Sequence, residues 1–281
     1  MAGYVDYKSA SSVPSGGPSP AIWADCPVIT FLRDPGKGFH KFDDFKNSVI
    51  TALATDTNQI CGDINWAAIS ETDDADDLTI KADDQGVLKI ETDGTDQDVH
   101  AITTGYNLAG ILNTPKKGEK KKFWFESRIN VSTITDGDIG LFVGLAQPGQ
   151  MADGAGVFGA DAAALADVDY LGFAVLEGDG DDVTIVYNEA SAGTAQSDTG
   201  EIAISAVDTY LKLGLYMDVD NEEIRVFFDG ADQGDDAAID ITTSNFPSDT
   251  DMDVIISLVA GSGAADGDHV EIDWVRFAQE Y

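Results

Sequence analysis

Two carboxylates near the end of the chain have a spacing that glycoside hydrolysis could use. Glu271 and Asp273 are separated by one residue, so an extended strand would point both side chains to one face. A pair of carboxylates can serve as nucleophile and acid/base in sugar cleavage. A third carboxylate is missing, because Val275 and Arg276 occupy the positions where it would be expected. We therefore predict that the protein is not an enzyme.

The same segment also fits the closing strand of a β-sandwich. Period-2 alternation would turn Val270, Ile272 and Trp274 toward a core. A register switch, through a bulge, would then turn Val275 and Phe277 inward. We favour this structural interpretation over a catalytic one.

The residue types that commonly bind metals do not form a strong metal-binding motif in this sequence. None of the three histidines lies in a zinc-binding or catalytic-triad pattern: His40, His100 and His269. Calcium binds six to eight oxygens, which Asp-rich loops can supply. The best calcium candidates share one short loop: Asp179, Asp181 and Asp182. Because Asp is so abundant, such runs arise by chance, so we expect no cofactor and keep calcium open.

One basic cluster contrasts with an otherwise acidic chain. Five of the 16 basic residues lie in a turn between Pro115 and Phe123: Lys116, Lys117, Lys120, Lys121 and Lys122. This turn is either a solvated loop or a contact with the acidic surface of a neighbouring copy, where unlike charges must meet.

Three aromatic residues are candidates for stacking against a sugar: Trp66, Trp124 and Tyr216. Alternation places Trp124 on the opposite face from Phe123 and Phe125. Trp124 is therefore either exposed to solvent or covered by another part of the chain.

Composition excludes several classes of partner. The chain of 281 residues has 51 acidic and 16 basic side chains and a net charge of −35, which disfavours nucleic acid and anionic membranes. Of the acidic residues 40 are Asp, which is typical of turns. The hydrophobic share of 43% is sufficient for a core, so the charge does not imply disorder.

The cysteines and the lack of a visible targeting signal point to synthesis and folding in a cytoplasm. Cys26 and Cys61 are not in a metal-type pair, and we favour free thiols while leaving a disulfide open. The first residues lack the apolar core of a secretory signal. No apolar run approaches the roughly 18 residues that span a membrane.

Alternating segments with Asp, Asn and Gly turns between them predict an all-β fold. One turn, 219–221, reads as a hairpin. About twelve strands and no convincing helix favour an antiparallel two-sheet β-sandwich or jelly roll over residues 39–281. The segments are 78–82, 87–91, 99–104, 122–131, 139–146, 170–176, 183–188, 201–205, 210–219, 222–229, 253–260 and 270–278.

Residues 1–38 predict an extended N-terminal arm. Pro, Gly and Ser between positions 11 and 20 disfavour helix and central strand. Apolar residues such as Ile22, Trp23 and Phe31 are unusual in a linker, so the arm should lie along its own domain or a neighbour.

Three further segments have weaker patterns. Phe39, Phe42 and Phe45 fit either a helical turn or an extended segment. Residues 46–76 are weakly patterned, and the acidic run 71–77 is expected to be a solvated loop. Residues 152–165 fit a loop with a short helix.

Several short pieces, in order along the chain, carry a resemblance to a known family. The pieces include 123–129, 142–146, 170–173, 210–214, 227–230 and 272–276. They resemble structural proteins of tailed-bacteriophage virions that have a concanavalin-like or laminin-G-like jelly roll. The resemblance implies a capsid decoration or cement protein without catalytic residues. It also implies a location on the virion and, as partners, the major capsid protein and further copies of this chain, as a homo-oligomer on the particle.

The sequence thus leaves three functional hypotheses. The first is capsid decoration, with Ile22, Trp23, Phe31 and the lysine turn as contact residues. The alternative is a carbohydrate-binding concanavalin-like module, in a head fibre or in tail-associated adhesion, using Trp66, Trp124 and Tyr216. A glycoside hydrolase that uses Glu271 is the third.

Overall fold

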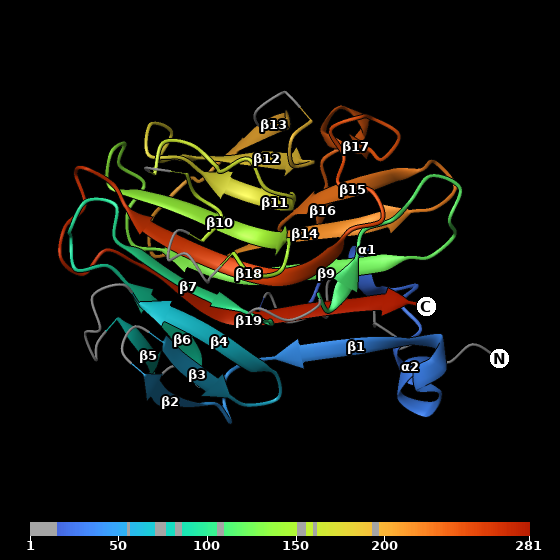
Figure 1. Cartoon of the computed structure of the whole chain (residues 1–281), viewed down its shortest axis with the longest axis horizontal. Coiled ribbons are helices and arrows are strands. Elements are labelled where there is room, and N and C mark those ends of the chain that lie inside the picture. The colour runs from blue at the N-terminus through green and yellow to red at the C-terminus, as the bar shows by residue number, and fades with distance from the viewer. Residues whose placement is uncertain are drawn as a thin grey trace.

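Two antiparallel sheets form the protein, as the alternating segments predict. The computed structural model describes residues 16–54, 57–70, 77–81, 86–105, 110–150, 156–159, 162–192 and 197–281. Sheet A has the strand order β16-β15-β14-β9-β19-β6-β5, with β1 also paired to β19 and β17 to β15. Sheet B has the order β13-β12-β11-β10-β18-β7-β4-β3-β2, with β8 also paired to β18. Figure 1 shows β1 and β19 side by side.

The strands of sheet A are β1 Gly38–Asp43, β5 Leu78–Lys81, β6 Val87–Glu91, β9 Phe123–Val131, β14 Leu211–Asp218, β15 Glu223–Phe228, β16 Ala231–Asp232, β17 Ile239–Asp240 and β19 His269–Glu280. Those of sheet B are β2 Val49–Ala54, β3 Thr57–Cys61, β4 Asn65–Ser70, β7 Val99–Thr103, β8 Leu112–Asn113, β10 Ile139–Ala146, β11 Tyr170–Val175, β12 Asp182–Asn188, β13 Ser197–Ala203 and β18 Asp251–Ala260. The helical segments are α1 Pro20–Trp23, α2 Val28–Arg33, η2 Pro35–Lys37 and η3 Asp235–Ala237. In the described part of the chain no helix has the length and apolar composition to cross a membrane.

The main core lies between the sheets, because one face of each strand is apolar. Phe125, Leu213 and Ile272 from sheet A pack in one cluster with residues of sheet B such as Leu141 and Ile256. All twelve predicted strands overlap an observed strand, and the predicted hairpin joins β14 to β15. The all-β, two-sheet sandwich is therefore confirmed.

The register switch predicted for the last strand is also confirmed. The pairing of β19 with β9 shifts between Ile272 and Trp274, so Val270 and Ile272 point inward before the shift and Val275 and Phe277 after it. The inward position predicted for Trp274 is wrong. Its ring is buried on the outer face of sheet A, where its Nε1 donates to the carbonyl of Gly16 at 2.7 Å.

Some weakly patterned segments form strands that were not predicted. Residues 46–76, which have only a weak pattern in the sequence, contain β2, β3 and β4. Phe39 and Phe42 lie in the strand β1, so the extended alternative is correct. The acidic run predicted to be solvated ends in a buried Asp77, and residues 71–76 lie outside the described residues. Within 156–159 and 162–165 there is an isolated bridge between Phe158 and Leu165 and no helix.

Chain segments cover part of the outer face of each sheet. Residues 156–159 and 162–168 pack on the outer face of sheet B in an apolar cluster with residues such as Phe142 and Tyr170. Residues 16–33, which we call the strap, pack on the outer face of sheet A through Ile22 and Trp23. The described part of the predicted arm is thus not extended: it contains two short helices and lies on its own domain.

The strap depends on a glycine in the strand below it. Gly214 in β14 leaves the space that Ile22 fills, since a Cβ on Gly214 would lie 2.3 Å from Ile22 Cδ1. We predict that Gly214→Ala lowers the free energy of unfolding by about 1–3 kcal/mol, because the strap must shift. Urea unfolding measures this.

Gly178→Ala is the matched control, because a Cβ there would meet no atom within 4 Å. We expect it to change the stability by no more than about 0.5 kcal/mol. Equal stability of the two variants would show that the packing of Ile22 on Gly214 is not tight.

Candidate functional site

The arm residues predicted to contact a capsid are buried in their own chain. Ile22, Trp23 and Phe31 form one cluster with Trp124 and Phe227 of sheet A. These side chains, which the sequence suggested as capsid contacts, are therefore not accessible to a partner in this conformation. The strap lies on its own domain, which is one of the two arrangements that the sequence left open for the arm.

A buried carboxylate anchors the strap. Glu126 in β9 accepts hydrogen bonds at Oε2 from the backbone N–H of Ser19, at 2.9 Å, and from Trp23 Nε1, at 2.7 Å. Its other oxygen, Oε1, is buried without a hydrogen-bond partner. Burial raises the pKa of Glu126, although the bonds from the strap act in the opposite direction. Strand alternation predicts that Glu126 faces outward, but nothing in the sequence shows that the strap covers it.

An arginine and a histidine support the same strap residue. The Arg276 guanidinium carbon lies 3.9 Å from the centre of the Trp23 ring, a cation–π contact. Arg276 Nε donates to His40 Nε2 at 2.9 Å, so this histidine nitrogen acts as an acceptor. Burial, with a further effect of Arg276, lowers the pKa of His40 from 6.5 to about 4. His40 is therefore a neutral structural residue.

The tryptophans proposed for sugar stacking are buried as well. Trp66 donates through Nε1 to Asp43 at 3.0 Å inside the core, and Trp124 donates to Asp25 of the strap at 3.0 Å. Trp124 thus follows the alternative in which another part of the chain covers it. The half-buried Tyr216 has its hydroxyl bonded to Asp25 and to Lys122, which leaves only part of its ring accessible. Stacking of a sugar on Trp66 or Trp124 is therefore ruled out in this conformation.

The lysine turn is partly neutralised by its own chain. Lys116 pairs with Asp249 at 2.8 Å, and Lys122 pairs with Asp25 of the strap. The backbone N–H of Gly118 donates to Glu222 at 2.7 Å. The remaining lysines of the turn are exposed, and no described carboxylate lies within ion-pair distance of them: Lys117, Lys120 and Lys121. Their contact with another copy stays a prediction.

The two carboxylates with catalytic spacing are both engaged. Glu271 accepts hydrogen bonds from Lys81 at 2.6 Å and from Tyr210 at 2.9 Å. Burial raises the pKa of Glu271, but these bonds outweigh it and hold the pKa below its ordinary value. Asp273 forms an ion pair with Arg128. An ionised Glu271 and a paired Asp273 do not supply the general acid that glycoside hydrolysis requires.

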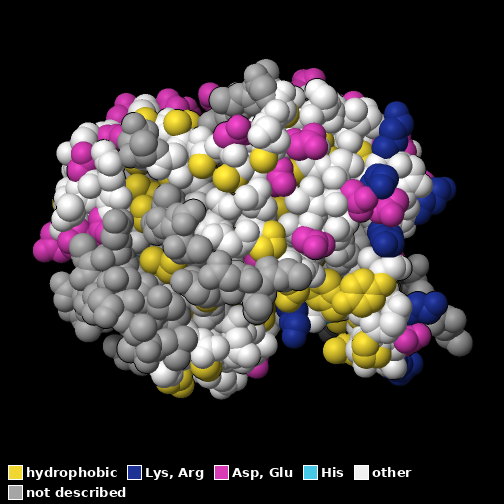
Figure 2. Space-filling model, viewed as in Figure 1, with side chains coloured by type: hydrophobic (Ala, Val, Ile, Leu, Met, Phe, Trp, Pro, Cys, Tyr) yellow, Lys and Arg dark blue, Asp and Glu magenta, His cyan; other side chains and the backbone are white. Residues whose placement is uncertain are grey.

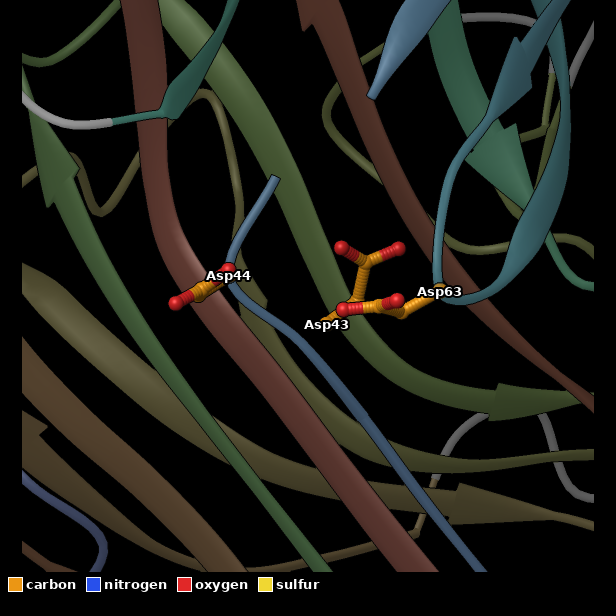
Figure 3. Close-up of side chains that lie close together, drawn as sticks. All are labelled: Asp43, Asp44 and Asp63. Carbon is orange, nitrogen blue, oxygen red and sulfur yellow. The ribbon is translucent and has the colours of Figure 1, made fainter. Parts of the chain in front are cut away.

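Among the residues that the structure describes, one group of three acidic side chains brings its oxygens within 4.8 Å of one another: Asp43, Asp44 and Asp63 (Figure 3). The buried Asp43 accepts three hydrogen bonds, from the N–H groups of Phe45 and Ile64 and from Trp66 Nε1. Asp44 pairs with Lys46. These contacts explain the group as a hydrogen-bonded turn. The calcium candidates of the other loop are not brought together in this way: Asp179, Asp181 and Asp182.

The cysteines and the remaining histidines carry no reactive arrangement. Cys26 is buried and Cys61 is exposed, and both are free thiols, as predicted. His100 is buried in β7 with Nε2 3.0 Å from Asp98. His269 is half-buried, with Nδ1 2.8 Å from the carbonyl oxygen of Gly267. Within the described residues neither histidine joins a metal-ligand cluster.

A pocket of about 250 Å³ lies at one end of the sandwich, between β8, the start of β18, the end of β19 and the lysine turn. We call it the end pocket. Its lining consists of Gly110, Ile111, Leu112, Asn113, Pro115, Glu119, Lys121, Asp251, Gln279, Glu280 and Tyr281. Figure 2 shows hydrophobic side chains at the surface near this end of the molecule, beside lysine and acidic side chains.

Strand pairing positions the polar groups of the end pocket. The backbone N–H of Asn113 donates to Gln279 Oε1 at 2.9 Å, which ties β8 to β19. Asn113 Nδ2 donates to Asp251 Oδ1 at 3.2 Å. Tyr281 is 64% exposed and packs against Phe39, with 5.9 Å between ring centres. This site could not be predicted from the sequence, because its residues come from distant segments that share no motif.

Comparison with known proteins defines the fold class. No protein-family model matches the sequence, and no curated protein matches it. An endo-1,3-β-glucanase from Streptomyces sioyaensis is similar in structure, with a TM-score of 0.56, 12% identity, and coverage of 87% of this chain and 97% of that chain. The carbohydrate recognition domain of Emp47p has a TM-score of 0.53, 11% identity, and coverage of 87% and 97%.

A protein of unknown function from Shewanella oneidensis MR-1 is also similar, with a TM-score of 0.54, 15% identity, and coverage of 87% of each chain. At such low identity these likenesses show the fold alone. The chain has a concanavalin-like β-sandwich fold, the fold of this glucanase and of this lectin domain. The comparisons do not bear on the virion resemblance.

The environment of His40 predicts a pH dependence of stability. Because the pKa of His40 is lower in the folded state, the unfolded chain binds the proton first as the pH falls. The contribution of His40 to stability is complete above about pH 6.5 and is lost toward about pH 4. We predict that His40→Gln, which keeps an acceptor for Arg276, removes this loss. Urea unfolding between these pH values measures it.

His269→Gln removes a second half-buried histidine of the same protein and is the matched control. We expect the difference in unfolding free energy between wild type and His40→Gln to change with pH across this range. The same pH dependence in both variants would contradict the role assigned to His40.

Proposed function

We propose that the protein binds saccharides in the end pocket and does not cleave them. The main support for the proposal is that one open pocket contains both an exposed aromatic ring, Tyr281, and several polar side chains. Ligand sites commonly combine apolar surface with a few placed polar groups. The similarity in fold to a glucanase and to a carbohydrate recognition domain supports the same class of ligand.

The chemistry of the pocket suits a sugar ring. The apolar face of a sugar can pack on the Tyr281 ring, and Ile111 adds apolar surface beside it. Sugar hydroxyls can donate to carboxylates such as Asp251 and can accept from the Lys121 ammonium. Because Gln279 and Asn113 are fixed by hydrogen bonds, this part of the pocket is organised before a ligand arrives.

The outer faces of the sheets are poor candidates for a catalytic cleft. The strap buries Glu126, and residues of sheet A hold Glu271 and Asp273 in hydrogen bonds and ion pairs. Part of the outer face of sheet B is an apolar cluster covered by residues 156–159 and 162–168. We expect no hydrolysis when the wild-type protein is incubated with a polysaccharide panel and released reducing ends are measured. Hydrolysis that Glu271→Gln abolishes would contradict this expectation.

Capsid decoration, with a location on the virion, rests on the sequence resemblance and stays a proposal. Ile22, Trp23 and Phe31 of the strap are buried against sheet A. A contact with a particle would therefore have to use another surface. The exposed lysines of the turn and residues 1–15, which lie outside the described residues, are the remaining candidates. Many-copy co-purification with intact particles supports this proposal, and absence from purified particles contradicts it.

The saccharide proposal predicts the effect of one substitution. Tyr281→Ala removes the exposed ring and should weaken binding about tenfold or more, as for other aromatic residues at the centre of a binding site. A glycan array first identifies a ligand, and calorimetric titration then measures its affinity for both proteins.

Leu32→Ala is the control, because Leu32 in α2 is a comparably exposed hydrophobic residue (72%) that does not line the pocket. We expect it to bind like the wild type. Binding that survives Tyr281→Ala unchanged would move the site away from the end pocket, and no binding to any glycan would end the proposal.

A further inference from the structure

We propose that the ligand of the end pocket is an amino sugar, a saccharide with a free ammonium group. This inference rests on the saccharide binding proposed above and adds the charge of the ligand. Three carboxylates line the pocket, against one ammonium group: Glu119, Asp251 and Glu280 against Lys121. A positively charged ligand reduces this imbalance, whereas a uronic or sulfated sugar increases it.

Hydrogen-bond capacity points in the same direction. Asp251 uses Oδ1 to accept from Asn113 Nδ2, and Glu280 uses Oε2 to accept from the backbone N–H of Lys122 at 3.1 Å. Within the described part of the chain, Glu119 has no side-chain hydrogen bond, and the second oxygens of Asp251 and Glu280 have none either. The pocket therefore offers more acceptors than donors. A ligand that fits it must donate, as an ammonium group does with three N–H bonds.

The aromatic ring adds to the preference for a cation. A cation near the face of a tyrosine ring is attracted by the electron density of the ring. Tyr281 is largely exposed at the pocket, so its ring can meet both the apolar face of a sugar and a neighbouring ammonium group. The net charge of −35 also attracts cations to the whole surface, so the experiment must separate the pocket from this general effect.

The test uses two ligands that differ in charge and share one ring system. The β-1,4-linked tetramer of glucosamine carries free amines, and its fully N-acetylated form does not. Titration calorimetry at about pH 5.5 keeps ordinary carboxylates ionised and the amines protonated. We expect the amino form to bind about tenfold or more tightly than the acetylated form at low salt, and less so at high salt.

A pair of variants separates the pocket from the general surface charge. Glu119→Gln combined with Asp251→Asn should weaken binding of the amino tetramer about fivefold or more. Asp179→Asn combined with Asp181→Asn makes the same change in net charge on an exposed loop and should have little effect. Glu119→Gln alone replaces the pocket pair if the double variant does not fold, since Glu119 makes no side-chain hydrogen bond in the described chain.

The outcomes distinguish this inference from the proposed function. If the acetylated tetramer binds as tightly as the amino form, and Tyr281→Ala weakens both, the amino-sugar inference is wrong and saccharide binding stands. If the pocket pair and the loop pair weaken binding equally, the ligand is held by general charge and the inference is wrong. If no saccharide binds, the inference and the proposed function fail together.

Discussion

The docking of the strap on sheet A decides which side chains of this protein can meet a ligand. Trp23 of the strap donates to Glu126 in the sheet and stacks on Arg276, and Asp25 holds Trp124 and Lys122. These contacts remove aromatic and charged groups from the surface. Residues 156–159 and 162–168 likewise bury an apolar part of the outer face of sheet B. The end pocket, in contrast, keeps polar and aromatic side chains accessible.

The distribution of charge is compatible with the docking of the strap on sheet A. The strap contains one acidic and one basic residue, Asp25 and Arg33, so its docking adds little repulsion to a chain with a net charge of −35. The lysine turn also favours docking of the strap, because Lys122 forms an ion pair with Asp25 of the strap. Lys116 of the same turn pairs with Asp249. The turn thus neutralises part of its own surroundings. The end pocket lies beside it and keeps an excess of carboxylates.

The strands were predictable where large apolar residues alternate with polar ones, as in 123–131 and 211–218. The strands within 49–70 were not, because they contain many small and polar residues, such as Ala52 and Asn58, whose placement depends on pairing with neighbours. Alternation also put Trp124 on the face opposite Phe123 and Phe125, which is the outer face of sheet A. It could not show that the strap covers this side chain, since the cover depends on contacts between distant residues, such as the bond from Trp124 to Asp25 and the packing of Ile22 on Gly214. The pocket residues Asn113 and Gln279 come from distant segments and meet through a hydrogen bond from backbone to side chain, which no local pattern predicts.

If the end pocket binds the saccharide, the ligand contacts the end of the sandwich and not its sheet faces. Amide chemical shifts of the isotope-labelled protein can locate the contact during titration with a saccharide found by glycan array. We expect the shifted amides to belong to residues 110–122, the start of β18 and the last residues of β19. Shifts concentrated in the strap, or in 156–159 and 162–168, would rule out binding in the end pocket.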